Sequence, residues 1–320
     1  MTNNNVLKYR HTVERIGNGI FAVMRFIVLA GICFYILYPF IQKAMLAVME
    51  KGDLYDSTVG LIPHNFTFEN ISKVWANLSY PKAFFKTLSI SLITAVCQVA
   101  SSTLVGYGFA RYDFPVKKLL FGMVIFTLLV PASTIIIPMY LNFRFFDFAG
   151  GIIYGLAGKS INLIGSTWTF IILGITCMGY KNGLYIYLIR QFYRGVPKEL
   201  EEAAMLDGAG HIKTFLNVML PSGRSIMTVV FMFSFVWQWT DIFYSSWFLK
   251  SSDVLSTNLS SLVTNIAIKE VSGGTSAIDG YYERLLNSTG CILVILPLLI
   301  MYLFAQKTFV ESIENSGIVG

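Results

Sequence analysis

The chain alternates long apolar stretches with shorter polar segments. A helix that crosses the ~30 Å hydrocarbon core of a bilayer needs about 20 predominantly apolar residues, because each residue rises about 1.5 Å and every backbone polar group must be bonded within the helix. Stretches of this kind recur six times along the 320 residues. They predict an all-α, polytopic membrane protein with transmembrane helices at Phe26–Val48, Ala83–Ala110, Leu119–Asn142, Ser166–Arg190, Arg224–Leu249 and Thr289–Phe309.

The positions of basic residues predict which helix ends face the cytoplasm, because short cytoplasmic segments are rich in lysine and arginine. Such residues precede the first stretch and follow the second, at Lys8, Arg10, Arg15, Arg25, Arg111, Lys117 and Lys118. Both termini are therefore predicted to be cytoplasmic. The predicted organisation is a cytoplasmic tail at 1–25, a first anchor at 26–48, an external loop at 49–82, a core at 83–310 with a cytoplasmic loop at 191–223, and a cytoplasmic tail at 311–320.

Composition supports the membrane assignment and excludes several other classes of protein. Only 13% of the residues are charged and 55% are hydrophobic, whereas a soluble domain carries roughly a quarter charged residues. The net charge of +6 is scattered beside the apolar stretches, so we expect no nucleic-acid partner. The four cysteines lie far apart in apolar runs, which predicts neither a disulfide framework nor a metal site.

Several predicted spans contain residues that disturb helices. They are Gly106 and Gly108 in the second, Pro131 and Pro138 in the third, Gly179, Lys181 and Gly183 in the fourth, and Pro297 in the sixth. Two interpretations remain open: simple kinks stabilised by neighbouring helices, or discontinuous helices that line a pathway. Lys181 makes the fourth span the weakest, because a charged side chain must snorkel, face a wet cavity or mark a break.

The cytoplasmic loop contains a predicted pair of short helices. Pro197 suits a first helical position, and acidic residues follow it over a helix at about 198–206. Gly208 suits the left-handed residue that ends such a helix. A second, amphipathic helix ends at Pro221 and places Ile212, Phe215, Leu216 and Met219 on one face. Three covers are possible for this face: the membrane surface, the inner ends of the spans, or another protein. The acidic start of the helix pair favours a groove on a soluble partner over the membrane surface.

One motif in this loop carries a family resemblance. Glu202-Ala203-Ala204, then Gly208, then Val218 with Leu220-Pro221 resembles the signature loop of permease subunits of binding-protein-dependent ABC importers, in which isoleucine usually stands at the position of Val218. The resemblance extends over about residues 60–320 and implies the type I importer permease fold. The segment 188–200 is similar to the carbohydrate branch, and to the shorter permease of maltose-type systems.

The resemblance implies a transporter subunit of the bacterial or archaeal cytoplasmic (inner) membrane, not an enzyme. Its coupling helix would dock on a separate ABC ATPase dimer, which would bind ATP and Mg; we expect no cofactor in this chain. The other implied partners are a second homologous permease, an extracytoplasmic substrate-binding protein, and a sugar or oligosaccharide substrate. The residues implied in ATPase coupling are Glu202, Ala203, Ala204, Asp207, Gly208, Leu220 and Pro221.

The fifth apolar stretch contains an aromatic and polar cluster. Its members are Trp237, Gln238, Trp239, Asp241 and Tyr244. Aromatic faces stack on sugars and polar groups bind their hydroxyls, and a carboxylate within a membrane faces protein or water, so the cluster is a candidate pathway lining. The alternative is an aromatic belt at the outer membrane interface.

Two other functions remain to be distinguished. A permease of the same superfamily for a non-sugar solute would share all these features. An ion-driven secondary transporter would carry inverted repeats and more ionisable residues within its spans, and neither is evident. An enzyme is disfavoured because His11, His64 and His211 all lie in segments predicted outside the membrane.

Overall fold

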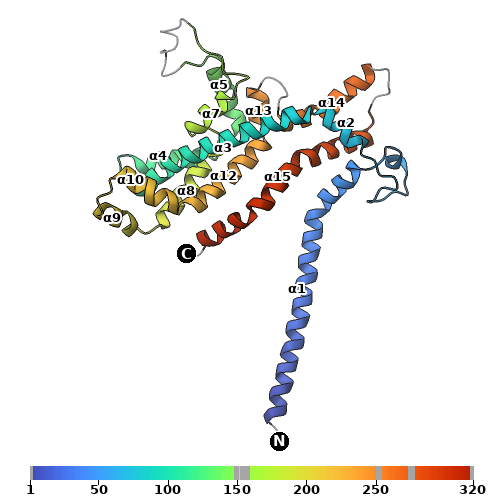
Figure 1. Ribbon diagram of the computed structural model, residues 1–320, viewed down its shortest axis with the longest axis horizontal. Helices are drawn as coiled ribbons and strands as arrows, with labels where there is room; N and C mark the ends of the chain where they lie inside the picture. The colour runs from blue at the N-terminus through green and yellow to red at the C-terminus, as the bar shows by residue number, and fades with distance from the viewer. Residues whose placement is uncertain (1–2, 148–150, 152–158, 250–253, 273–277, 318–320) are drawn as a thin grey trace. The chain divides into compact units, whose positions relative to one another are not determined.

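The computed structural model describes residues 3–147, 151, 159–249, 254–272 and 278–317, with side chains between 17 and 307. The ends of both predicted tails, at 1–2 and 318–320, lie outside the described residues, as do residues 148–150, 152–158, 250–253 and 273–277 of the predicted core. Helices dominate the described residues, and the β-pairing among them is limited to isolated bridges from Met49 to Phe66 and from Phe146 to Ile161. The all-α prediction is therefore confirmed (Figure 1).

The helices differ widely in length, and the longest are the ones that the apolar pattern predicts. They are α1 (Asn3–Ala47), the short 3-10 helix η1 (Gly52–Tyr55), α2 (Glu69–Asn77), α3 (Tyr80–Arg111), α4 (Lys117–Thr127), α5 (Ala132–Arg144), α7 (Trp168–Ile175), α8 (Asn182–Gly195), α9 (Glu199–Leu206), α10 (His211–Thr214), the π-helical turn η3 (Phe215–Met219), α11 (Leu220–Ser222), α12 (Arg224–Trp239), α13 (Phe243–Phe248), α14 (Leu255–Ser272) and α15 (Gly280–Gly317).

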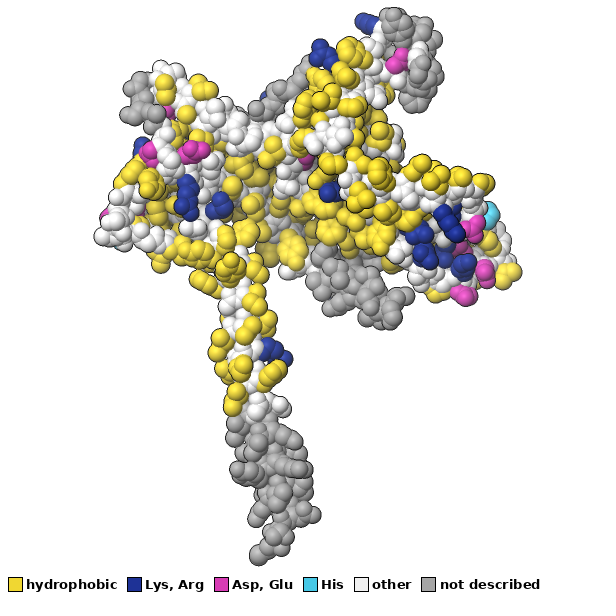
Figure 2. Space-filling model, turned by 180° about the vertical axis from the view of Figure 1, so that it is seen from behind, with side chains coloured by type: hydrophobic (Ala, Val, Ile, Leu, Met, Phe, Trp, Pro, Cys, Tyr) yellow, Lys and Arg dark blue, Asp and Glu magenta, His cyan; other side chains and the backbone are white. Residues whose placement is uncertain are grey.

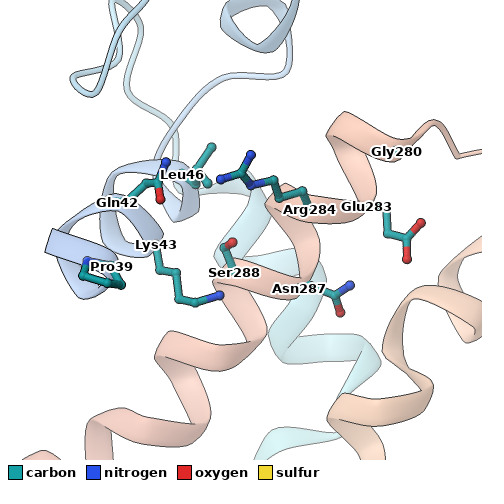
Figure 3. A pocket seen from close by; sticks show the side chains of 9 residues that line it. All are labelled: Pro39, Gln42, Lys43, Leu46, Gly280, Glu283, Arg284, Asn287 and Ser288. Atoms are coloured by element: carbon teal, nitrogen blue, oxygen red, sulfur yellow. The ribbon is translucent and has the colours of Figure 1, made fainter.

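The chain divides into two compact units, of which the first comprises Met1–Val74 and Glu270–Ile292. Lys73 of α2 forms an ion pair with Glu270 of α14 and donates a 3.0 Å hydrogen bond to the hydroxyl of Tyr282 in α15. This one side chain therefore contacts both of the later helices. A polar pocket of about 330 Å³ lies between α1 and α15 in this unit. Figure 3 shows that Lys43 and Arg284 contribute cationic side chains to its lining.

Helix α1 has the properties of a membrane span without intramolecular cover. The most apolar 18 residues within its stretch Gly17–Ala47 have a mean hydropathy of 2.5, and none of these residues is buried. Phe26 and Tyr35, for example, are exposed to 71% and 82%. Figure 2 shows hydrophobic side chains along the visible face of its described part. A helix that is apolar all round requires lipid or another protein around it.

The second unit comprises Trp75–Lys269 and Leu293–Gly320, and α3 is its central helix. α3 packs against α7, α8 and α12, and it buries a set of small polar residues in addition to apolar ones. The hydroxyl of Tyr80 at the start of α3 donates a 2.9 Å hydrogen bond to the carbonyl oxygen of Leu293 in α15. Aromatic and aliphatic side chains fill the space between α3, α8 and α12.

Only some of the predicted spans are continuous helices. Three helices in the described part, α1, α3 and α15, are long and apolar enough to cross a membrane, and Pro297 lies inside α15 without interrupting it. The predicted third span consists of α4 and α5, which meet at 101°, and Pro131 is the N-cap residue at that bend. Proline lacks the N–H group that would continue the helix, which explains the break.

The fourth and fifth predicted spans are also divided. α7 and α8, which are separated by residues 176–181, are each too short to cross a bilayer alone. α12 ends at Trp239 rather than at the predicted Leu249, and α13 follows from Phe243. At its other end α12 bends by 71° from the short helices before it, so the described residues contain up to five spans if each bent pair counts as one.

Candidate functional site

The predicted helix pair of the cytoplasmic loop is present, with adjusted ends. α9 covers Glu199–Leu206, so Pro197 lies outside the helix, two residues before its start and not at its first position. Gly208 has a φ of +84°, the left-handed conformation that the sequence predicts at this point. The chain then re-enters a helix at His211 and continues through Pro221 to Ser222.

The second helix does not present one apolar face, as the sequence predicts, but two. Met219 is fully buried, and the ring of Phe215 packs 4.8 Å from that of Tyr107 in α3. Ile212 and Leu216 remain 77% and 50% exposed. Phe215 and Met219 form one line along the helix, and Ile212 and Leu216 form an adjacent one. Side chains of α3 and α8 cover only the first line.

The uncovered line forms a patch with α9, which we call the exposed tip. Its members are Met205, Leu206, Ile212 and Leu216, and Leu206 is 88% exposed. Glu202 and Ala203 are exposed on α9, and Asp207 and Gly208 are exposed in the turn that follows it, whereas Ala204, Leu220 and Pro221 are half-buried. The tip offers apolar contact area beside carboxylates, which suits a protein partner with a groove.

A single arginine anchors α9 to the end of α3. The Nε atom of Arg111 lies 2.8 Å from the Oε1 atom of Glu201, and its Nη2 atom donates a 2.7 Å hydrogen bond to the carbonyl oxygen of Val196. The two side chains are only 5% and 14% exposed. The sequence carries no local signal for this pair, because the two residues are 90 positions apart in the chain and their contact depends on the fold.

A tyrosine of α8 packs against the bend that precedes α12. Tyr193 is fully buried, and its hydroxyl donates a 3.1 Å hydrogen bond to the carbonyl oxygen of Met219. Gly223 stands at the bend, where an added Cβ would lie 2.3 Å from the hydroxyl oxygen of Tyr193. The tip is therefore connected to α3 through Arg111 and to α8 through Tyr193.

The residues of the aromatic and polar cluster have different surroundings. Trp239 is buried; its Nε1 atom donates a 3.1 Å hydrogen bond to the carbonyl oxygen of Val294, and its ring stacks on Phe235. Asp241 accepts hydrogen bonds from the backbone N–H groups of Tyr244 and Ser245, at 3.2 and 2.7 Å. Asp241 thus caps the first turn of α13. Gln238, the remaining polar member of the cluster, is half-buried.

Trp237 and Tyr244 instead lie near a cavity of about 600 Å³, which we call the break cavity. It is lined by both helix breaks, at 127–132 and 177–183, together with Ile135, Pro138, Met139 and Tyr244. The ring of Tyr180 lies 6.2 Å from that of Trp237 and 5.6 Å from that of Tyr244. The fold therefore places two discontinuous spans around one cavity, which agrees with the second interpretation of the helix-breaking residues.

A buried polar network holds the break between α7 and α8. The amide nitrogen of Gln98 donates to the Oδ1 atom of Asn182 at 2.9 Å and to the carbonyl oxygen of Tyr180 at 3.3 Å. The hydroxyl of Ser234 in α12 donates to the amide oxygen of Gln98, and Asn182 donates to Ser102 at 3.0 Å. The polar residues of α3, spaced three and four apart from Thr87 to Ser102, carry a sequence signal for this network.

Comparisons with known proteins agree with this architecture. Residues 102–315 match the family described as the binding-protein-dependent transport system inner membrane component. The chain is similar to the maltodextrin transport system permease protein MalD of Streptococcus pneumoniae, with 24% identity over 92% of this chain and 94% of that protein. It is 30% identical to the osmoprotective compounds uptake permease protein GgtD of Synechocystis, over 78% of this chain and 74% of that protein.

A solved structure shares the fold. It is a chain in the crystal structure of a bacterial ABC transporter involved in the import of the acidic polysaccharide alginate, with a TM-score of 0.65 and 20% identity over 92% of this chain and 98% of that chain. These matches confirm the predicted resemblance to carbohydrate-type permeases and the prediction that the chain is a transporter subunit, not an enzyme. The chain belongs to the family of inner-membrane components of binding-protein-dependent transport systems.

Proposed function

We propose that this chain is one of two permease subunits of an ATP-driven importer for a sugar or oligosaccharide. The named substrates of its relatives support the sugar class: maltodextrin for MalD, and melibiose, raffinose and stachyose for MelC of Bacillus subtilis. In this proposal an extracytoplasmic binding protein delivers the sugar, and a second permease completes the pathway. Both termini and the loop 191–223 face the cytoplasm, where the positive charges of the flanking segments favour them.

The observation that carries the proposal is the exposed tip. Its four apolar side chains lie beside the exposed carboxylates of Glu202 and Asp207, and nothing in the described chain covers it. We assign this surface to contact with a separate ATPase, which binds ATP and Mg. The chain's family also disfavours an ion-driven mechanism, because its members work with binding proteins.

The contacts around the tip suggest how motion is passed on. Closure of the ATPase pair displaces α9 and α10, and the ion pair between Glu201 and Arg111 transfers that displacement to α3. The buried contact of Tyr193 with Met219 transfers it to α8. Asn182 and Gly183 at the start of α8 line the break cavity, and Gln98 of α3 is bonded to Tyr180 beside it. A displacement carried along these two helices therefore reaches the cavity without requiring a chemical step in this chain.

Replacement of Ile212 by aspartate tests the coupling role. A charge at the centre of a docking surface should reduce the amount of ATPase that co-purifies with the permease by roughly tenfold or more, because a few central apolar residues contribute most of the binding free energy. Ile62→Asp is the matched control, since Ile62 is 66% exposed in the segment predicted to be external. Equal ATPase recovery with both variants would contradict the proposed contact.

A further inference from the structure

The break cavity contains an isolated positive charge. Lys181 is the one charged residue among the described residues that line this cavity. The segment predicted as the fourth span contains Lys181, and a lysine within a membrane protein is costly unless it faces water, protein or a counter-charge. No carboxylate of the described residues forms an ion pair with its ammonium group.

The fold holds this lysine in an unfavourable backbone conformation. Lys181 has a φ of +66° and Cys177, four residues earlier, a φ of +58°, so the short break contains two left-handed residues other than glycine. Such residues are uncommon and persist where surrounding contacts enforce them. Here the hydrogen bonds of Gln98 to Asn182 and to the carbonyl oxygen of Tyr180 fix the residues on both sides of Lys181.

Aromatic rings position the ammonium group. The Nζ atom of Lys181 lies 4.9 Å from the centroid of the Tyr180 ring and 5.6 Å from that of Trp237. Ring faces attract a cation but carry no net charge, so they stabilise the ammonium group and leave its charge uncompensated. A ligand that entered the cavity would meet both this cation and the side chain of Tyr244, which also lines the cavity.

We propose that the break cavity receives a carbohydrate that carries a negative charge, and that its carboxylate or phosphate pairs with Lys181. This inference rests on the proposed function and names the substrate class of the same pathway. A neutral sugar needs hydroxyl-binding groups and ring faces, and it gains nothing from an uncompensated cation. An anionic sugar uses both the rings and the charge, since a charge-assisted hydrogen bond is about twice as strong as a neutral one.

Equilibrium binding to the complete reconstituted complex tests the inference. The radiolabelled probes are digalacturonate, glucose 6-phosphate and the neutral maltotriose, each measured without the binding protein. We expect saturable binding of an anionic probe, and a loss of affinity of about 10–100-fold in Lys181→Gln. Lys181→Arg keeps the charge and should retain most of the affinity. Lys118→Gln, which removes an exposed lysine outside the cavity, is the matched control.

The outcomes separate the inference from the function on which it rests. Binding of digalacturonate alone identifies a carboxylate-bearing sugar, and binding of glucose 6-phosphate alone a phosphorylated one. Absence of saturable binding of either anion, or binding that Lys181→Gln leaves unchanged, overturns the inference. In that case, ATP-driven uptake of maltotriose in the presence of the binding protein would show that the proposed importer function stands. Absence of ATP-driven uptake of every probe would overturn both.

Discussion

Replacement of Glu201 by glutamine tests whether the ion pair with Arg111 holds α9 against α3. At 2.8 Å and an effective dielectric constant of about 20, the gross attraction between the two charges is about 6 kcal/mol. Removal of both side chains from water offsets much of that attraction. Because glutamine leaves the buried charge of Arg111 without its counter-charge, we expect a net loss of about 1.5–3 kcal/mol, which is the size of the penalty for a buried polar group without a partner.

Hydrogen exchange of the α9 amides is the appropriate assay, because it reports the free energy of local opening. A loss of about 1.5–3 kcal/mol corresponds to exchange about 10–150-fold faster in α9. Glu202→Gln is the control: it changes the same residue type one position away, at an exposed site, and should alter the opening free energy by no more than about 0.5 kcal/mol. If both variants accelerate exchange equally, the ion pair does not hold the helix.

Two further predictions concern other contacts. Gly223→Ala places a Cβ 2.3 Å from the hydroxyl oxygen of Tyr193 and should lower the free energy of unfolding by about 1–3 kcal/mol, as measured by thermal unfolding of the purified protein. Addition of Tyr193→Phe, which removes that oxygen, should recover part of the loss. Absence of recovery would refute the steric cause. In the first unit, the hydroxyl of Tyr55 donates a hydrogen bond to Asp279 and lowers the pKa of that carboxyl. Because the folded pKa is below the unfolded value, this stabilisation is present above the unfolded pKa, about 3.9, and is lost as the pH falls through the folded pKa. Limited proteolysis should therefore show protection of this segment that declines in acid, and Tyr55→Phe should reduce the protection at neutral pH but not at the lowest pH.

The predictable part of the structure depends on local sequence. The apolar lengths of α1, α3 and α15, the left-handed Gly208 and the family motif around Glu202 are all set by residues within a few turns of each other. Each has a direct physical signal, such as the number of residues that a bilayer requires or the absence of a Cβ. For this reason the fold class and the family could be recognised from the chain alone.

The unpredicted part depends on contacts between distant segments. Whether Phe215 or Ile212 is covered is decided by where Tyr107 of α3 lies, and periodicity alone cannot distinguish the two lines of one helix. Asp241 similarly reads as an intramembrane carboxylate in the sequence, whereas its hydrogen bonds to Tyr244 and Ser245 depend on a helix break that the apolar pattern does not reveal.

The polar network around Gln98 has a consequence for how the protein changes conformation. Apolar contacts between helices are non-directional, so a shift of one helix against another leaves no polar group without a partner. Here the amide of Gln98 bonds to residues of α8 through its nitrogen and to Ser234 of α12 through its oxygen, and a shift of one helical turn would leave these buried groups without partners. α3, α8 and α12 should therefore move together as one rigid body, and the conformational change that opens and closes the pathway should be concentrated at the bend around Pro131.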